Sequence, residues 1–265
     1  MIVETYFYYL RMSVVIQQPV KKQRKSKKLP DDVVILNEVP VIDKKLQTED
    51  LGKIFEMAIC LFYNIPYKGK YKYSMEEAEN LKHRLHLLST VFPYKLIHTA
   101  ENGGQYDFTG AEDETIKLSA KTTKKDGKVC PQVIGQPSKK KFCEFFSIDP
   151  SYTLEQIKAY IETNVTAMLE IYFNFTFDCP VLYYNKKTNQ LLLIKLIQKI
   201  NWSNNMIEFS HNKKKKVWNE STTIAVNNIT ISEFQVHNHR DSIKFRWAFE
   251  KLLKQFPESF ETRII

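Results

Sequence analysis

The sequence has no long hydrophobic run and no paired cysteines. Its 265 residues contain no apolar stretch approaching the ~18–20 residues that a membrane-spanning helix requires. The partly apolar stretch from Tyr6 to Ile16 is interrupted by Arg11 and lacks a basic lead and a small-residue cleavage site, so we do not expect a signal peptide. The four cysteines occur singly, which disfavours a zinc cage or a disulfide framework. These absences predict an intracellular, cytoplasmic protein that is not associated with a membrane.

The composition predicts a globular core and a polyanionic partner. Hydrophobic residues make up 43% of the chain, enough for one large domain. The formal net charge of +9 favours binding to nucleic acid first and to an anionic membrane surface second. Residues 18–30 are basic and bounded by prolines, so residues 1–47 are expected to form a flexible N-terminal arm. That arm could bind a nucleic-acid backbone, act as a nuclear localisation signal, or be a solvated tail.

The order of the predicted elements indicates an α/β (α+β) fold. Helices are expected at about 48–64, from Ser74 and at about 153–174, and Ser74-x-x-Glu77 and Thr153-x-x-Gln156 have the spacing of capping boxes. The chain is expected to be extended from Tyr94 to His98 and to form strands after Cys179. These later strands are predicted at 181–184, 191–200 and near 206–210, 216–218, 222–226 and 231–237, and an amphipathic helix is predicted from Asp241 onward.

The most informative segment runs from Gly104 to Lys121. Thr115–Lys121 alternates as a strand does, with Ile116, Leu118 and Ala120 on one side and Lys117, Ser119 and Lys121 on the other. The polar turn at 111–114 could fold this strand back against Asp107. An aspartate beside a strand that ends in lysine suits metal-dependent hydrolysis of a phosphodiester, because the carboxylate can hold a cation and the lysine can offset charge.

A second carboxylate, Glu56, lies within the helix predicted at 48–64. That helix is apolar on nearly all sides, and Glu56 is its only charged residue between Lys53 and Lys68. A buried carboxylate is costly unless it pairs with a cation or binds metal. The sequence leaves both roles open, a structural ion pair and a supporting role at a metal site.

The arrangement Asp107…Ser119-x-Lys121 resembles the PD-(D/E)xK nuclease superfamily, which includes most type II restriction endonucleases. Ser119 stands where that family usually has Asp or Glu, as in its Ser-x-Lys variants, and this removes one metal ligand. Gly52-Lys53-Ile54-Phe55-Glu56 is similar to the helix that often completes the metal site in this family. The resemblance implies a restriction-endonuclease-like core, with a central mixed sheet flanked by helices, in a single catalytic domain over 48–265.

The resemblance also implies roles for the site residues. Asp107, alone or with Glu56, would bind Mg²⁺, and the main chain near residue 120 could supply a further ligand. Lys121 would position the attacking water or stabilise the transition state, and Ser119 would hold a water by a hydrogen bond.

Polar and basic clusters downstream are candidate DNA contacts. The first follows the catalytic strand, and the alternative there is a turn with solvated amides. The second comes after residue 232, where the alternative is a metal site with only two ligands, His237 and His239. The candidate DNA-binding residues are Lys124, Lys125, Gln132, Gln136, Lys139, Lys140, Gln235, His237, His239, Arg240, Lys244 and Arg246.

The sequence therefore predicts a Mg²⁺-dependent type II restriction endonuclease that hydrolyses double-stranded DNA. Cutting both strands at a palindrome requires two active sites, so a homodimer is expected. Two alternatives remain open: a structure-selective nuclease of the same fold, such as a junction resolvase, and a DNA-binding protein without catalytic activity.

Overall fold

The computed structural model describes residues 48–100, 105–125, 127–131, 138–214, 217–239 and 241–265, with the side chains of residues 48, 49, 213 and 214 excepted. All of them belong to one compact unit, Lys45–Ile265. The predicted N-terminal arm lies outside the described residues. None of the helices in the described part of the chain has the length and apolar character to cross a membrane.

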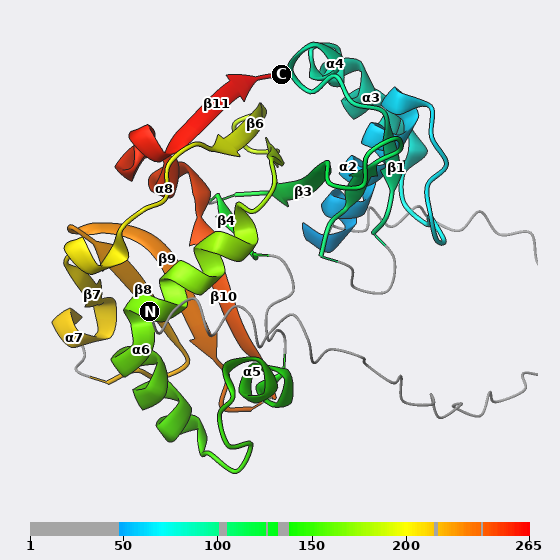
Figure 1. Cartoon of the computed structure of the whole chain (residues 1–265). Helices are drawn as coiled ribbons and strands as arrows, with labels where there is room; N and C mark the ends of the chain where they lie inside the picture. Colours follow the sequence, from blue (N-terminus) through cyan, green and yellow to red (C-terminus); the bar gives the residue numbers. More distant parts are fainter. Residues whose placement is uncertain (1–47, 101–104, 126, 132–137, 215–216, 240) are drawn as a thin grey trace, which may run out of the picture. The chain divides into compact units, whose positions relative to one another are not determined.

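A six-stranded mixed sheet forms the centre of this unit (Figure 1). Its spatial order is β1 (Leu96–His98), β2 (Phe108–Gly110), β3 (Lys117–Thr123), β5 (Val181–Asn185), β6 (Gln190–Leu196) and β11 (Phe260–Ile264). β3 and β5 are parallel, and the other neighbouring strands are antiparallel. The predicted α/β fold with a central mixed sheet is confirmed, and it is consistent with a restriction-endonuclease-like core.

The helices α2 (Thr48–Tyr63) and α3 (Met75–Lys82) cover one face of this sheet. Their apolar side chains pack with Leu118 of β3 and Leu182 of β5 in one hydrophobic cluster. Ser74 accepts the predicted capping hydrogen bond from the Glu77 N–H. At Gly52, a Cβ would lie 3.8 Å from Oγ1 of Thr122, an ordinary van der Waals distance, so α2 packs against β3 at this point.

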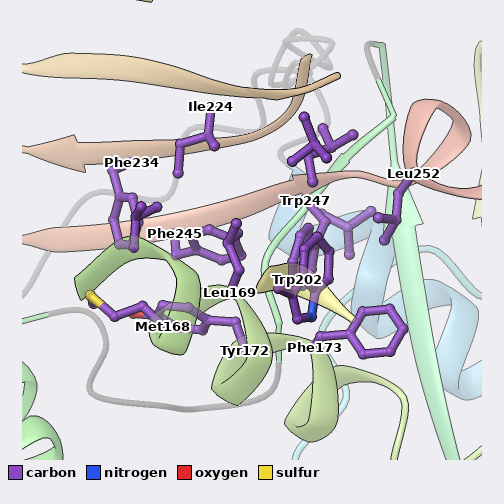
Figure 2. Packing of buried hydrophobic residues seen from close by; sticks show 14 of the residues in the cluster. Met168, Leu169, Tyr172, Phe173, Trp202, Ile224, Phe234, Phe245, Trp247 and Leu252 are labelled. Atoms are coloured by element: carbon purple, nitrogen blue, oxygen red, sulfur yellow. The ribbon is translucent and has the colours of Figure 1, made fainter. Parts of the chain in front are cut away.

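The long helix α6 (Leu154–Thr176) packs in a second hydrophobic cluster, with Val181 and Tyr183 of β5. Its N-terminus has the full capping box of Thr153 and Gln156, as predicted. Figure 2 shows Tyr172 of α6 against Phe245, and the two rings are stacked with their centroids 4.1 Å apart.

A second, five-stranded antiparallel sheet packs in the same cluster as α6. Its spatial order is β4 (Lys128–Val129), β10 (Ile243–Ala248), β9 (Ile229–Val236), β8 (Ser221–Val226) and β7 (Ile207–Phe209). The prediction of a helix from Asp241 onward is wrong for residues 243–248, which form β10. Ile243, Phe245 and Trp247 alternate into the core, and α8 (Phe249–Gln255) begins only after them.

The remaining elements are short. They are η1 (His83–Leu85), α4 (Leu88–Val91), α5 (Lys139–Phe146), η2 (Trp202–Asn204), α7 (Ser210–Lys214) and η3 (Pro257–Ser259). Two strand predictions need correction: β6 ends at Leu196, well before residue 200, and residues 217–218 form no strand. The helix α5 was not predicted; Ser138 caps it by accepting a hydrogen bond from the Lys141 N–H.

Candidate active site

Asp107 is fixed against the middle of β3 by three groups. Its Oδ2 accepts hydrogen bonds from the Ala120 N–H at 2.7 Å and from the Ser119 hydroxyl at 3.0 Å. Nζ of Lys121 lies 3.8 Å from the same oxygen. Local pairing explains this geometry, because Phe108 pairs with Leu118 across the hairpin and Asp107 therefore comes opposite Ser119.

Strand alternation places the polar side chains of β3 on the face of the sheet that meets α6. Ser119 pairs with Val181 and Lys121 with Tyr183 across the parallel β3–β5 ladder, and Val181 and Tyr183 belong to the α6 cluster. Ser119 is fully buried, whereas the Lys121 side chain is 15% exposed and the Asp107 side chain 17% exposed. The expected polar working face is therefore present, with its two charged groups still open to solvent.

Glu56 is held by partners on the other face of the sheet. Its carboxylate accepts hydrogen bonds from Nζ of Lys53 at 2.8 and 3.0 Å. The Lys68 N–H donates to Nδ1 of His98, so that nitrogen carries no proton and Nε2–H is the donor to Glu56, at 3.3 Å. His98 packs against Phe108, whose side chain lies in the cluster beneath α2. The structure does not bring Glu56 to Asp107, and it favours the ion-pair interpretation of Glu56.

These partners also set the protonation of Glu56. Burial raises the pKa of its carboxyl, but hydrogen bonds from His98 and Lys53, with the positive charge of Lys53, outweigh burial and leave the pKa below its usual value. The charged carboxylate therefore stabilises the fold above the pKa of the unfolded chain, and this contribution is lost as the pH falls through the folded pKa.

Glu56→Gln should lower the free energy of unfolding near pH 7 by about 1.5–3 kcal/mol, the range for hydrogen bonds to a charged group. The difference between the two proteins should shrink as the pH falls below about 4.5, the usual pKa, and toward the lowered pKa at which the folded wild-type carboxyl becomes neutral. Urea unfolding at several pH values measures this, with the exposed Glu76→Gln of α3 as the control. A difference that persists unchanged at pH 3 would contradict the assigned role.

The side chains around Asp107 fit a cation held by few protein ligands. The part of the chain that the structure describes contains no group of three or more His, Cys, Asp or Glu side chains able to hold a metal ion. Oδ2 of Asp107 is occupied, while no hydrogen bond from a described residue reaches Oδ1. Mg²⁺ commonly binds through one or two carboxylates and completes its shell with water and substrate phosphate oxygens, so a single free carboxylate oxygen suits it.

A basic groove of about 760 Å³ opens beside this site. Lys121 lines it, together with the loop after β3 and the polar face of β9 and β10. Every charged residue among the described lining residues is a cation: Lys121, Lys124, Lys125, Lys128, Lys244 and Arg246. The groove therefore brings together residues from both predicted clusters of DNA contacts, the one that follows β3 and the one on β9 and β10.

The chain is similar to the type II restriction enzyme CviAII of Paramecium bursaria Chlorella virus 1. The two are 49% identical over 221 residues, which cover 83% of this chain and 64% of CviAII. The chain thus spans less than two thirds of the length of CviAII. No protein-family model matches the chain, and no solved structure matches it.

The class of enzyme to which CviAII belongs is the class that the residues at positions 107–121 suggested from sequence.

The predicted DNA-binding residues have varied surroundings in the structure. Gln235, Lys244 and Arg246, three of the predicted DNA contacts, line the groove together. The main-chain N–H of Lys139 donates to Asp241, so α5 begins beside the turn between β9 and β10.

Some of the other predicted contacts do not line the groove, and others lie outside the described residues. Lys140 is exposed and lies 3.9 Å from Glu144, and Nδ1 of His237 lies 3.8 Å from Glu220. His239 is exposed. Three of the predicted DNA-binding residues lie outside the described residues: Gln132, Gln136 and Arg240.

Two residues of the groove region were missed by sequence reasoning. Lys128 lines the groove, and Glu233 contacts its side chain from β9. Strand alternation places Glu233 on the same side as Gln235, and this pattern could have indicated Glu233 from the sequence. Nothing local marked Lys128, because its strand β4 consists of two residues only.

Proposed function

We propose that this protein is a Mg²⁺-dependent endonuclease of the type II restriction class, which hydrolyses double-stranded DNA at specific sequences. The observation that carries the proposal is the Asp107–Lys121 pair, whose lysine lines a groove in which every charged lining residue that the structure describes is a cation. The similarity to a type II restriction enzyme over 83% of the chain supports it. DNA suits this groove because its backbone carries regularly spaced negative phosphates, which the lysines and the arginine of the groove can contact.

In this proposal the site residues divide the work as follows. Oδ1 of Asp107 would hold Mg²⁺, and the Ala120 N–H and the Ser119 hydroxyl would keep the carboxylate oriented by binding Oδ2. When bound, the cation would supply Lewis-acid stabilisation of the phosphate and lower the pKa of water. The Lys121 ammonium would orient the attacking water and stabilise the negative charge that grows on the phosphate oxygens.

The proposal gives Ser119 a different task from the one expected from sequence. Ser119 is buried and donates to Asp107, so it would act by orienting that carboxylate rather than by holding a water. Glu56, held by Lys53 and His98, would contribute to the stability of α2 against the sheet. Because both strands of a symmetric site must be cut, we propose that two copies of the chain act together as a homodimer.

The test is incubation of a plasmid of known sequence with the protein and Mg²⁺, with EDTA as the control. Discrete fragments that vanish with EDTA are expected. Cleavage restricted to branched substrates would instead favour a junction resolvase, and binding without cutting in any divalent metal would favour a non-catalytic DNA-binding protein.

The groove cations should also appear in the salt dependence of DNA binding. Lys125→Gln and Lys244→Gln should each flatten the slope of log K against log[salt] by about 0.9 if each contacts one phosphate. Fluorescence anisotropy with a labelled duplex between low and moderate salt measures the slope. Lys199→Gln, which removes an exposed lysine outside the groove, is the matched control and should leave the slope as in the wild type. Equal slopes for all four proteins would mean that DNA does not use this groove.

A further inference from the structure

A single buried carboxylate organises the side chains at the β9–β10 side of the groove. Glu233 is 6% exposed and lies on β9 directly opposite Arg246 of β10. Its Oε2 accepts from Nη2 of Arg246 at 2.9 Å and lies 2.9 Å from Nζ of Lys128. Its Oε1 accepts from Nε2 of Gln235 at 3.2 Å. Three groove residues from three strands therefore share this one carboxylate.

The carboxylate stays charged in these surroundings. Burial raises the pKa of Glu233, but the hydrogen bonds from Lys128 and Gln235 and the charges of Arg246 and Lys128 outweigh burial and lower it below the usual value. An ionised carboxylate can accept hydrogen bonds but cannot donate them. Every group that faces Glu233 must therefore present a donor to it.

This requirement fixes the orientation of the Gln235 amide. The NH₂ group must face Glu233, so the carbonyl oxygen Oε1 turns away from it. Arg246 is fixed in the same way through Nη2, and its remaining terminal nitrogen, Nη1, makes no hydrogen bond to a described residue. Both residues line the groove, where Oε1 of Gln235 would offer an acceptor and Nη1 of Arg246 a donor.

We propose that Glu233 is a positioning residue for DNA sequence recognition, which sets the donor and acceptor pattern that Gln235 and Arg246 present to base edges. The inference rests on the proposed function in that the groove must bind DNA. In the major groove a guanidinium matches the O6 and N7 acceptors of guanine. A glutamine carbonyl oxygen matches the exocyclic amino group of adenine or cytosine. Glu233 itself touches no base in this proposal and acts only through its neighbours.

The experiment is selection of bound duplexes from a randomised DNA pool, with Ca²⁺ in place of Mg²⁺, followed by sequencing. Glu233→Gln removes the charge and lets residue 233 donate, so the Gln235 amide is free to turn over. We expect the variant to lose preference by about 10- to 100-fold at one or two base pairs of the selected sequence, the range for a bidentate base contact. Its affinity for random DNA should stay within about threefold of the wild type, because no groove cation is removed.

Two further variants make the result specific. Gln235→Leu, with Glu233 intact, should lose preference at the same base pairs as Glu233→Gln. If Glu233→Gln folds poorly, Gln235→Leu still tests whether the Gln235 amide contributes to the preference at one or two base pairs. Glu261→Gln removes an acid of β11 that accepts from Arg263 and should select the wild-type sequence. An unchanged sequence for both Glu233→Gln and Gln235→Leu overturns the proposal, as does an even loss of preference at every position.

This outcome is separable from that of the proposed enzyme activity. A wild-type protein that selects a sequence but does not cut DNA with Mg²⁺ would refute the proposed nuclease activity. The role of Glu233 would still be decided by comparing the sequences that the wild type and the variants select. A wild-type protein that cuts discretely, but whose selected sequence does not depend on Glu233 or Gln235, would refute the positioning role alone.

Discussion

Asp107→Asn should lower the rate of DNA cleavage by at least about 10³-fold, with little change in DNA affinity. The asparagine carbonyl oxygen can still accept from the Ala120 N–H and the Ser119 hydroxyl, which fixes the amide in place. The NH₂ group then occupies the position of Oδ1, where it cannot bind a cation. Single-turnover cleavage with excess enzyme and a binding titration of the same duplex separate the two effects.

Asp113→Asn is the matched control for that substitution. Asp113 lies in the turn of the same hairpin, where its Oδ1 accepts from the Thr115 N–H and hydroxyl, and it makes no contact with β3 residues 119–121. Its cleavage rate should stay within a few-fold of the wild-type rate. If Asp107→Asn also cut at close to the wild-type rate, the metal would have to be held elsewhere.

Lys121→Met should reduce single-turnover cleavage by about 10²–10³-fold, the usual cost of removing one group that stabilises transition-state charge. Methionine keeps the length and apolar stem of the lysine, so the packing of β3 against β5 should be preserved. The lost ammonium lies 3.8 Å from Asp107 and belongs to a residue that lines the groove. The rate at saturating enzyme should fall far more than the affinity for DNA.

Lys117→Met controls for the loss of a positive charge on the same face of β3. Lys117 donates to Oγ1 of Thr109 and lies over the Tyr106 ring, away from the Asp107 carboxylate. It should change affinity slightly and the single-turnover rate little. Equal rate losses for Lys117→Met and Lys121→Met would show that general electrostatics, not a specific lysine, supports cleavage.

Local sequence patterns were reliable wherever neighbouring residues determine the structure. The alternation of Ile116, Leu118 and Ala120 predicted β3 and the side on which Ser119 and Lys121 lie. The capping boxes predicted the starts of α3 and α6, since a cap depends on residues three apart.

The same reasoning failed where one pattern fits two structures. Ile243 and Trp247 are four residues apart and suit a helical face, but with Phe245 they also alternate as a strand does. Pairing with β9 and β4 on either side decided for the strand β10. β9 comes directly before β10 in the chain, but β4 lies far away in sequence, and local periodicity carries no information about that pairing.

By itself, then, the sequence determined the hairpin, the pairing of Asp107 with Lys121 and the basic charge that a polyanion would meet. Only the tertiary structure decided that Glu56 lies on the opposite face of the sheet, with His98 and Lys53. It also decided that Gln235, Lys244 and Arg246 line one groove with Lys121. Residues on a hairpin are placed by the turn that joins them, whereas faces of different elements meet only when long-range strand pairing and core packing bring them together.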